Sequence, residues 1–139
     1  MTDNFFFLLE NADTGSSHTL ADTLSALRFN EQGLLPVVTQ CATSKRVLMM
    51  AWMNADALTQ TLRDGEMVYF SRRRQMLWRK GETSGCTQRL QALFVDCDGD
   101  TLLAQVEQTG PACHTRRPSC FYLRLTANSL TLQKNALTE

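Results

Sequence analysis

An α+β fold is predicted by three features of the 139-residue sequence. Segments rich in β-prone residues outnumber segments with helical periodicity, and the two kinds do not alternate as in a doubly wound sheet. Apolar residues make up 43% of the chain, which is enough for one core without disulfide staples. We therefore expect a compact single domain of mostly antiparallel strands with about two helices.

Composition divides the chain into three parts. Residues 1–20 are polar and turn-rich around one short apolar run, and we expect a loosely ordered leader there. Residues 21–126 contain the predicted strands and helices of the domain. Residues 127–139 form a C-terminal tail of marginal structure.

The first elements of the domain each have a local reason. A short helix is expected to begin near Asp22, which can serve as its N-cap. Strand-prone runs at 35–40 and 46–52 flank a polar tetrapeptide, a pattern that predicts a hairpin. A second helix is expected after Asn54, because apolar residues then recur at helical spacing until Gly65.

The second half of the domain is expected to contain mainly strands and turns. Strands are predicted at 67–71, 87–97 and 101–108, the last two joined by a tight Asp-Gly-Asp turn. A final strand is predicted at 121–126. The basic, glycine-bearing segment 72–85 is expected to be a loop with the composition of an anion site.

Charge and cysteine usage exclude several classes of partner. Fourteen basic residues balance fourteen acidic ones, so no overall field attracts nucleic acid or an anionic membrane. No segment approaches the roughly 20 apolar residues of a membrane span, and the run at 5–9 is too short for a signal peptide. The five cysteines favour free thiols in a reducing, cytoplasmic setting.

Three of the cysteines lie near one another in the sequence together with a histidine. Cys97, Cys113 and Cys120 would leave one position open on a tetrahedral zinc ion, as catalytic sites do. The alternative is that they are small buried hydrophobic residues. His114 could be a zinc ligand, a general base for a metal-activated water or a hydrogen-bonded turn residue.

Three aspartates alternate with other residues nearby, namely Asp96, Asp98 and Asp100. Their carboxylates could chelate a hard cation such as Mg²⁺. If 95–100 is extended, they share one face of the strand and Cys97 points to the other. A calcium loop is disfavoured because its sixth position is Thr101 instead of glycine and its flanks are β-type. A solvent-facing acidic turn is the remaining alternative.

The basic segment carries guanidinium, ammonium and hydroxyl groups of the kind that hold phosphate. The candidate phosphate ligands are Arg72, Arg79, Lys80, Thr83 and Ser84. A run of arginines is equally typical of a solvated face, so both interpretations stay open.

Five further segments of the sequence lie at 47–54, 69–72, 77–85, 96–100, and 112–115 with 119–122. In this order they resemble motifs of phosphoribosyl-AMP cyclohydrolase from histidine biosynthesis. The resemblance implies a zinc- and magnesium-dependent hydrolase acting on a small nucleotide, N1-(5-phosphoribosyl)-AMP. It would open the purine ring between N1 and C6 and give the phosphoribosyl-formimino-aminoimidazole carboxamide ribotide.

The resemblance also implies ligands and a partner. Zinc would be held by Cys97, Cys113 and Cys120, and magnesium by Asp96, Asp98 and Asp100. In the family the zinc site is shared across an intertwined homodimer, with the first cysteine from one subunit and the other two from its partner. Arg116 stands where the family usually has glycine. The chain has no room for the pyrophosphatase domain to which many relatives are fused, so a monofunctional form is expected.

Two other functions stay open on the residues alone. One is a metal-stabilised dimeric binding module, in which zinc would be buried by four protein ligands without turnover. The other is a zinc-dependent purine deaminase, which would release ammonia.

Overall fold

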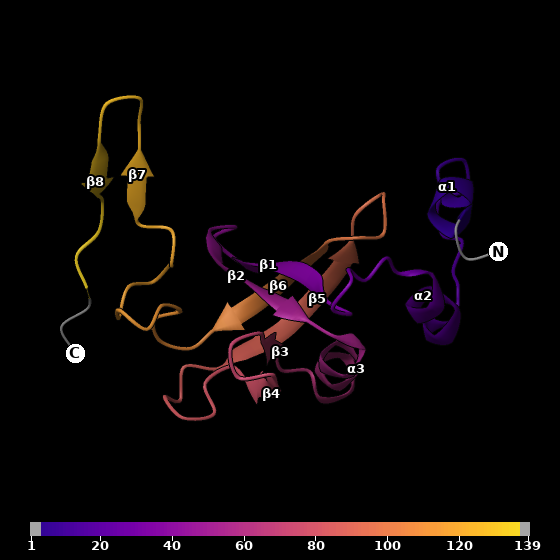
Figure 1. Ribbon diagram of the computed structural model, residues 1–139, viewed down its shortest axis with the longest axis horizontal. Helices are drawn as coiled ribbons and strands as arrows, with labels where there is room; N and C mark the ends of the chain where they lie inside the picture. Colours follow the sequence, from indigo (N-terminus) through magenta and orange to yellow (C-terminus); the bar gives the residue numbers. More distant parts are fainter. Residues whose placement is uncertain (1–3, 137–139) are drawn as a thin grey trace.

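A four-stranded sheet forms the centre of the computed structural model, which describes residues 4–136 (Figure 1). Its strands are β1 (Leu35–Cys41), β2 (Val47–Met53), β5 (Gln88–Val95) and β6 (Leu102–Gln108). The order is β2-β1-β6-β5, with antiparallel pairs β1–β2 and β5–β6 and a parallel pair β1–β6 between them. The two predicted hairpins are confirmed, and the parallel pairing joins them into one sheet.

Two smaller hairpins complete the strands. β3 (Val68–Ser71) pairs with β4 (Met76–Arg79), and β7 (Leu123–Leu125) pairs with β8 (Leu130–Leu132). The expectation of a loop throughout 72–85 is wrong for β4, because Leu77 and Trp78 pack against the core and draw this stretch into a strand. β8 also lies in the tail, where marginal structure was expected.

The helices are α1 (Phe5–Leu9), α2 (Leu20–Ala26) and α3 (Ala55–Asp64). α3 is as predicted: the Asn54 side chain accepts a hydrogen bond from the amide of Ala57 at 2.8 Å, and Gly65 ends the helix at φ +74°. α2 is capped by Thr19, which accepts from the amide of Asp22 at 3.1 Å, so the prediction of Asp22 as N-cap is wrong. Within residues 4–136, no helix combines the length and the hydropathy needed to cross a bilayer.

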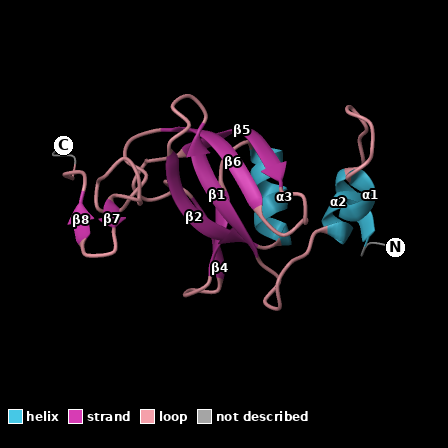
Figure 2. Ribbon diagram, turned by 90° about the horizontal axis from the view of Figure 1, so that it is seen from above, coloured by secondary structure: helices cyan, strands magenta, loops and turns pink. Residues whose placement is uncertain are grey.

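The core lies between the sheet and a layer formed by α3 and the β3–β4 hairpin. Leu35, Val37 and Thr39 alternate along β1 and are fully buried toward this layer. Tyr69 of β3 is also fully buried. In Figures 1 and 2, α1 and α2 lie beyond one end of the sheet and the β7–β8 hairpin beyond the other.

The opposite face of the sheet carries an apolar row that crosses all four strands. Neighbouring residues in the register make up this row: Met50, Val38, Leu103 and Phe94. Met50 is 40% exposed and Phe94 is 50% exposed, so the ends of the row are open to solvent. A row of this kind on a sheet is typical of a surface that another protein covers.

Candidate metal centre

The turn between β5 and β6 gathers three carboxylates, those of Asp96, Asp98 and Asp100. One oxygen of each lies within 4.8 Å of the other two, and all three side chains are exposed. The turn closes by a 3.1 Å hydrogen bond from the amide of Gly99 to the Asp96 carbonyl. The amide of Asp100 donates to Asp96 Oδ1, also at 3.1 Å. We refer to residues 96–100 as the aspartate turn.

The aspartate turn is not an extended strand. β5 ends at Val95, and Gly99 has φ +73°, a left-handed conformation that glycine adopts without strain. The expectation that alternation along a strand separates the carboxylates from Cys97 is therefore wrong. The bend itself brings the acids together. Three carboxylates so close repel one another unless a cation neutralises them, and oxygen ligands of this kind suit Mg²⁺.

Cys113 and Cys120 meet in the loop between β6 and β7. Their thiols interact directly, and Thr115 Oγ1 donates a 2.9 Å hydrogen bond to Cys113 Sγ. Burial acts to raise the pKa of Cys113, but the hydrogen bonds from Thr115 outweigh it and the pKa lies below its ordinary value. Although Cys120 is exposed at the surface, the surrounding protein and the neighbouring Cys113 raise its pKa to about 11. One thiol of the pair is thus prepared to ionise first, and zinc binds cysteine as thiolate.

Hydrogen bonds from distant parts of the chain hold this cysteine loop in place. Lys80 Nζ donates to the Ala112 carbonyl at 2.7 Å, and Ser119 Oγ donates to the Val47 carbonyl at 2.8 Å. The Lys80 charge also acts to lower the pKa of Cys120, against the stronger effect of burial. Lys80, predicted only as a phosphate ligand, therefore lies beside the thiols and supports their loop.

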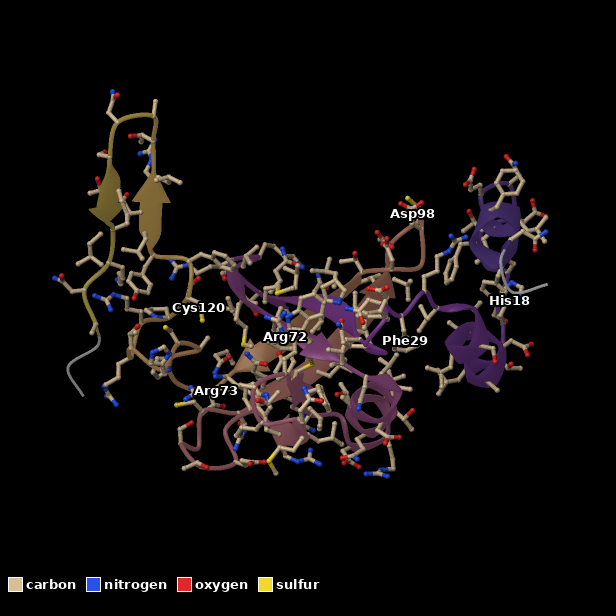
Figure 3. The ribbon with its side chains drawn as sticks, viewed as in Figure 1. His18, Phe29, Arg72, Arg73, Asp98 and Cys120 are labelled. Atoms are coloured by element: carbon tan, nitrogen blue, oxygen red, sulfur yellow. The ribbon has the colours of Figure 1, made fainter. Side chains whose placement is uncertain are left out.

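Cys97 lies apart from the other two cysteines. β6 has seven residues, and at about 3.3 Å per residue it carries the chain roughly 20 Å from the aspartate turn toward the cysteine loop. Figure 3 shows Asp98 and Cys120 on opposite sides of the central sheet. Within the described part of the chain, the aspartate turn is the single cluster of three potential metal ligands. Each Zn–S bond is only about 2.3 Å long, so one zinc ion cannot bind both Cys97 and Cys113 of the same chain.

The predicted phosphate ligands lie in different environments. The Arg72 guanidinium stacks 4.6 Å above the Trp52 ring. Arg79 is engaged by two carboxylates, at 2.7 Å from Asp64 and 3.6 Å from Glu66, and a phosphate would compete with both. The side chains of Thr83 and Ser84 are exposed on the following turn, as is His114 on the cysteine loop. Sequence reasoning missed Trp52 as the partner of Arg72, and only its place in a family motif marked it.

Comparison with known proteins identifies the family. A family model described as phosphoribosyl-AMP cyclohydrolase matches residues 49–122, more than half of the chain. A protein of that name from Alkalilimnicola ehrlichii is 58% identical over 122 residues, 88% of this chain and 86% of the relative. The chain belongs to the phosphoribosyl-AMP cyclohydrolase family.

Two further phosphoribosyl-AMP cyclohydrolases show how much of the chain is shared. The protein from Acidiphilium cryptum is 55% identical over 107 residues, 77% of this chain and 92% of the relative. The protein from Chromohalobacter salexigens is 48% identical over 134 residues, 96% of this chain and 92% of the relative. The second alignment is long enough to reach into both terminal segments, which lie outside the family-model match.

Arg116 stands where the family usually has glycine, and the backbone conformation at this position explains why glycine suits it. Arg116 has φ +66°, in the left-handed region, and its amide donates to the Cys113 carbonyl at 3.0 Å. A residue with a Cβ atom pays roughly 1–2 kcal/mol in this conformation, whereas glycine does not. The turn after Cys113 is therefore one that glycine suits, and this member of the cyclohydrolase family forms it with arginine.

Proposed function

We propose that this protein hydrolyses the N1–C6 bond of the purine ring in N1-(5-phosphoribosyl)-AMP, a step of histidine biosynthesis. Membership of the phosphoribosyl-AMP cyclohydrolase family supports this activity. The product is the phosphoribosyl-formimino-aminoimidazole carboxamide ribotide. We place the reaction in the cytoplasm, since all five cysteines are free thiols and a reducing compartment keeps them so.

The reaction needs water as a nucleophile at C6. The ribosyl group on N1 makes C6 electron-poor, and water adds there to give a tetrahedral carbon. Collapse of that carbon breaks the C6–N1 bond, the water oxygen becomes the carboxamide oxygen, and a proton passes to N1. No ammonia leaves, which separates this hydrolysis from the deamination of adenine at the same carbon.

The donor atoms of the chain fit the two metals that the family implies. Cys97, Cys113 and Cys120 would hold zinc, which lowers the pKa of the attacking water toward ~7. The aspartate turn would hold Mg²⁺ and with it orient phosphate or ribose oxygens of the substrate. We assign proton acceptance from the water to His114, and its exposure on the cysteine loop next to Cys113 supports this role.

The substrate's two 5′-phosphates need cationic partners. We assign one phosphate to the predicted set Arg72, Arg79, Lys80, Thr83 and Ser84. The set contains two arginines, and the described ion pairs with carboxylates involve Arg79 but not Arg72. The Arg72 guanidinium lies over the Trp52 ring instead. Arg72 is therefore a stronger candidate than Arg79, because a phosphate there would not displace an acidic partner.

We infer that a second copy of the chain completes the zinc site. The observation that carries this proposal is the position of Cys97, which the length of β6 separates from Cys113 and Cys120. A homodimer in which Cys97 of one subunit meets the cysteine loop of the other would bring three thiolates to one ion. Activity would then depend on dimerisation.

The C-terminal hairpin supports such a dimer. β7 and β8 pair so that four leucines share one face, Leu123 opposite Leu132 and Leu125 opposite Leu130. Each of them is at least 49% exposed. A two-stranded hairpin is marginally stable by itself in water, and an uncovered leucine face makes it a surface for association. The apolar row on the open face of the sheet is a second surface that a partner subunit could cover.

A turnover assay tests the function and the zinc site together. Loss of the N1-substituted adenine absorbance should require metal and stop on addition of a chelator. Cys97→Ser should lower kcat by about 100-fold or more, because it removes a ligand. Cys41→Ser is the matched control, since the Cys41 thiol accepts a 3.4 Å hydrogen bond from the amide of Ser44, which a serine can also accept.

Full activity of Cys97→Ser would overturn the zinc assignment, and released ammonia would favour a deaminase instead. Absence of any turnover with four protein ligands on zinc would favour a binding module.

A further inference from the structure

Phe6 is the buried residue of α1. Its side chain is 8% exposed, whereas Phe7 and Leu8 beside it are each 63% exposed. A helix of five residues is too short to be stable by itself. The position of α1 therefore depends on its contacts with the rest of the fold, and among the residues of α1 Phe6 is the most deeply buried.

The Phe6 ring packs directly on Gly99, the glycine of the aspartate turn. A methyl group added at Gly99 would overlap the ring. Gly99 is buried although the carboxylates of Asp98 and Asp100 on either side of it are exposed. The Gly99 carbonyl also accepts a 2.8 Å hydrogen bond from the amide of Arg28, just after α2. Two parts of the first 30 residues thus hold Gly99: Phe6 contacts its Cα side, and Arg28 binds its carbonyl.

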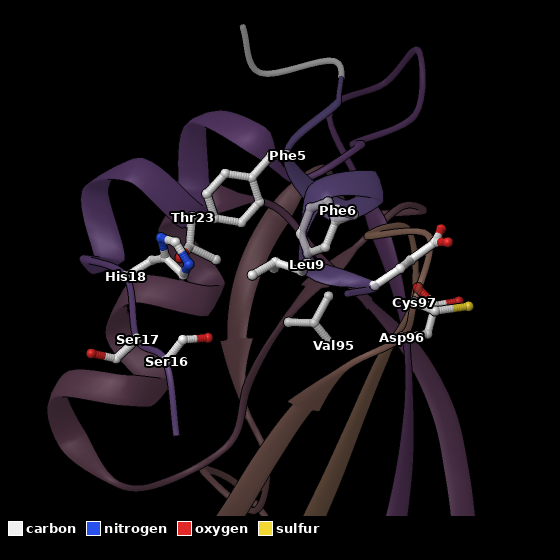
Figure 4. A pocket seen from close by; sticks show the side chains of 11 residues that line it. Phe5, Phe6, Leu9, Ser16, Ser17, His18, Thr23, Val95, Asp96 and Cys97 are labelled. Carbon is white, nitrogen blue, oxygen red and sulfur yellow. The ribbon is translucent and has the colours of Figure 1, made fainter. Parts of the chain in front are cut away.

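A cavity of about 400 Å³ lies beside this contact. Figure 4 shows Phe5, Phe6 and Leu9 of α1 among its lining residues, together with Asp96 and Cys97. The helix therefore lies along the side of the turn that carries two of the predicted metal ligands. Phe6 lies outside residues 49–122, the part of the chain that the family model matches, whereas Gly99 lies inside it.

We propose that Phe6 is a positioning residue for the aspartate turn. Its ring presses on Gly99 and keeps the carboxylates of Asp96, Asp98 and Asp100 within reach of one divalent cation. Without this contact, repulsion among the three acids would spread the turn, and a cation would have to gather them at a cost in affinity. Phe6 acts through Gly99 and touches neither metal nor substrate. The inference rests on the proposed function only in taking the turn as a cation site.

The test is a titration of the full-length chain with Mn²⁺, a paramagnetic substitute for Mg²⁺, with free Mn²⁺ measured by electron paramagnetic resonance. Phe6→Ala should bind about 10-fold more weakly than wild type, as is typical when support of a metal ligand is lost. Phe7→Ala removes the same ring from the same helix at an exposed position and should bind as wild type does. Phe6→Leu keeps part of the contact and should show an intermediate loss. Circular dichroism establishes that each variant is folded.

The outcomes separate this inference from the proposed function. A folded Phe6→Ala protein that binds Mn²⁺ as tightly as Phe7→Ala would remove the positioning role and leave the metal site standing. If Phe6→Ala does not fold, equal affinity of Phe6→Leu and wild type would remove it in the same way. If wild type binds no Mn²⁺, or Asp98→Asn binds it unchanged, the magnesium assignment fails and the positioning role fails with it.

Discussion

At the scale of single residues, the Tyr69 hydroxyl is the centre of a buried polar network. It donates to Gln88 Oε1 at 2.6 Å and lies 2.7 Å from Thr39 Oγ1, and all three residues are fully buried. Burial raises the pKa of Tyr69, so the hydroxyl stays protonated and remains a donor. Tyr69→Phe should lower the free energy of unfolding by about 1–3 kcal/mol, because the fully buried Gln88 Oε1 loses its hydrogen-bond donor.

Urea unfolding measures this difference. Tyr122→Phe is the matched control, since Tyr122 is half-buried and its ring, which lies 4.0 Å below the Arg117 guanidinium, is retained. That change should stay within about 0.5 kcal/mol. Equal stability of Tyr69→Phe and wild type would contradict the importance of the network.

The candidate metal ligands could be proposed from the sequence, whereas the residues that support them could not. Thiols and carboxylates beside one another suggest metal ligands by their type alone, which is the basis of that prediction. The contact of Lys80 with the Ala112 carbonyl spans 32 positions of the chain, and no local pattern encodes it. The sequence indicates the role of Phe6 only weakly, by an apolar run in a polar leader. Its partner Gly99 is far from it in the sequence, so no local pattern links the two.

At the scale of elements, an ion pair joins the end of α3 to β4. Asp64 accepts hydrogen bonds from Arg63 at 2.8 Å and from Arg79 at 2.7 Å, and these hold its pKa well below the usual range. A carboxyl with a depressed folded-state pKa stabilises the fold above its unfolded pKa of about 4, and this stabilisation is lost as the pH falls toward the folded value. Asp64→Asn should therefore be slightly less stable than wild type at pH 7, with a difference that shrinks below about pH 4.

Thermal unfolding midpoints of the two proteins between pH 7 and pH 3 measure this effect. Because the pair is exposed, 1 M NaCl should reduce the difference at pH 7. A difference between Asp64→Asn and wild type that is the same at every pH and salt concentration would mean that the ion pair does not link α3 to β4.

Elements with local signals were predictable, and elements that depend on distant contacts were not. α3 has a capping residue at Asn54 and an ending glycine at Gly65, both readable in the sequence. β4 lies among basic residues and becomes a strand by pairing with β3 and by packing Leu77 and Trp78 on the core. The parallel pairing of β1 with β6 joins residues about 65 positions apart, and periodicity alone does not specify such a pair.

At the scale of the whole molecule, the positions of the thiols bear on whether a monomer or a dimer could form the proposed zinc site. Cys97 and Cys113 are close enough in the sequence that their residue type alone predicts one cluster of metal ligands. In the fold, β6 lies between them and carries the chain roughly 20 Å, because a strand of seven residues cannot fold back on itself. If all three cysteines bind one zinc ion, as we propose, the third ligand has to come from a second chain.

Mixing two inactive variants tests that conclusion. In the proposed shared site, Cys97→Ser and Cys113→Ser would each destroy the zinc site of their own homodimer. A heterodimer of the two keeps one complete site, since Cys97 then comes from the Cys113→Ser chain and Cys113 with Cys120 from the Cys97→Ser chain. Random exchange should restore about a quarter of the turnover and zinc content of wild type.

The control mixture joins Cys113→Ser with Cys120→Ser, whose lost ligands lie on the same side of the site. Each site of this heterodimer lacks one cysteine, so a shared site predicts no recovery of turnover or zinc. Sites held within single chains would give no recovery in either mixture, and recovery in both would indicate that the ligands are not these three cysteines. Recovery in the first mixture alone requires that Cys97 and the pair Cys113 and Cys120 come from different subunits.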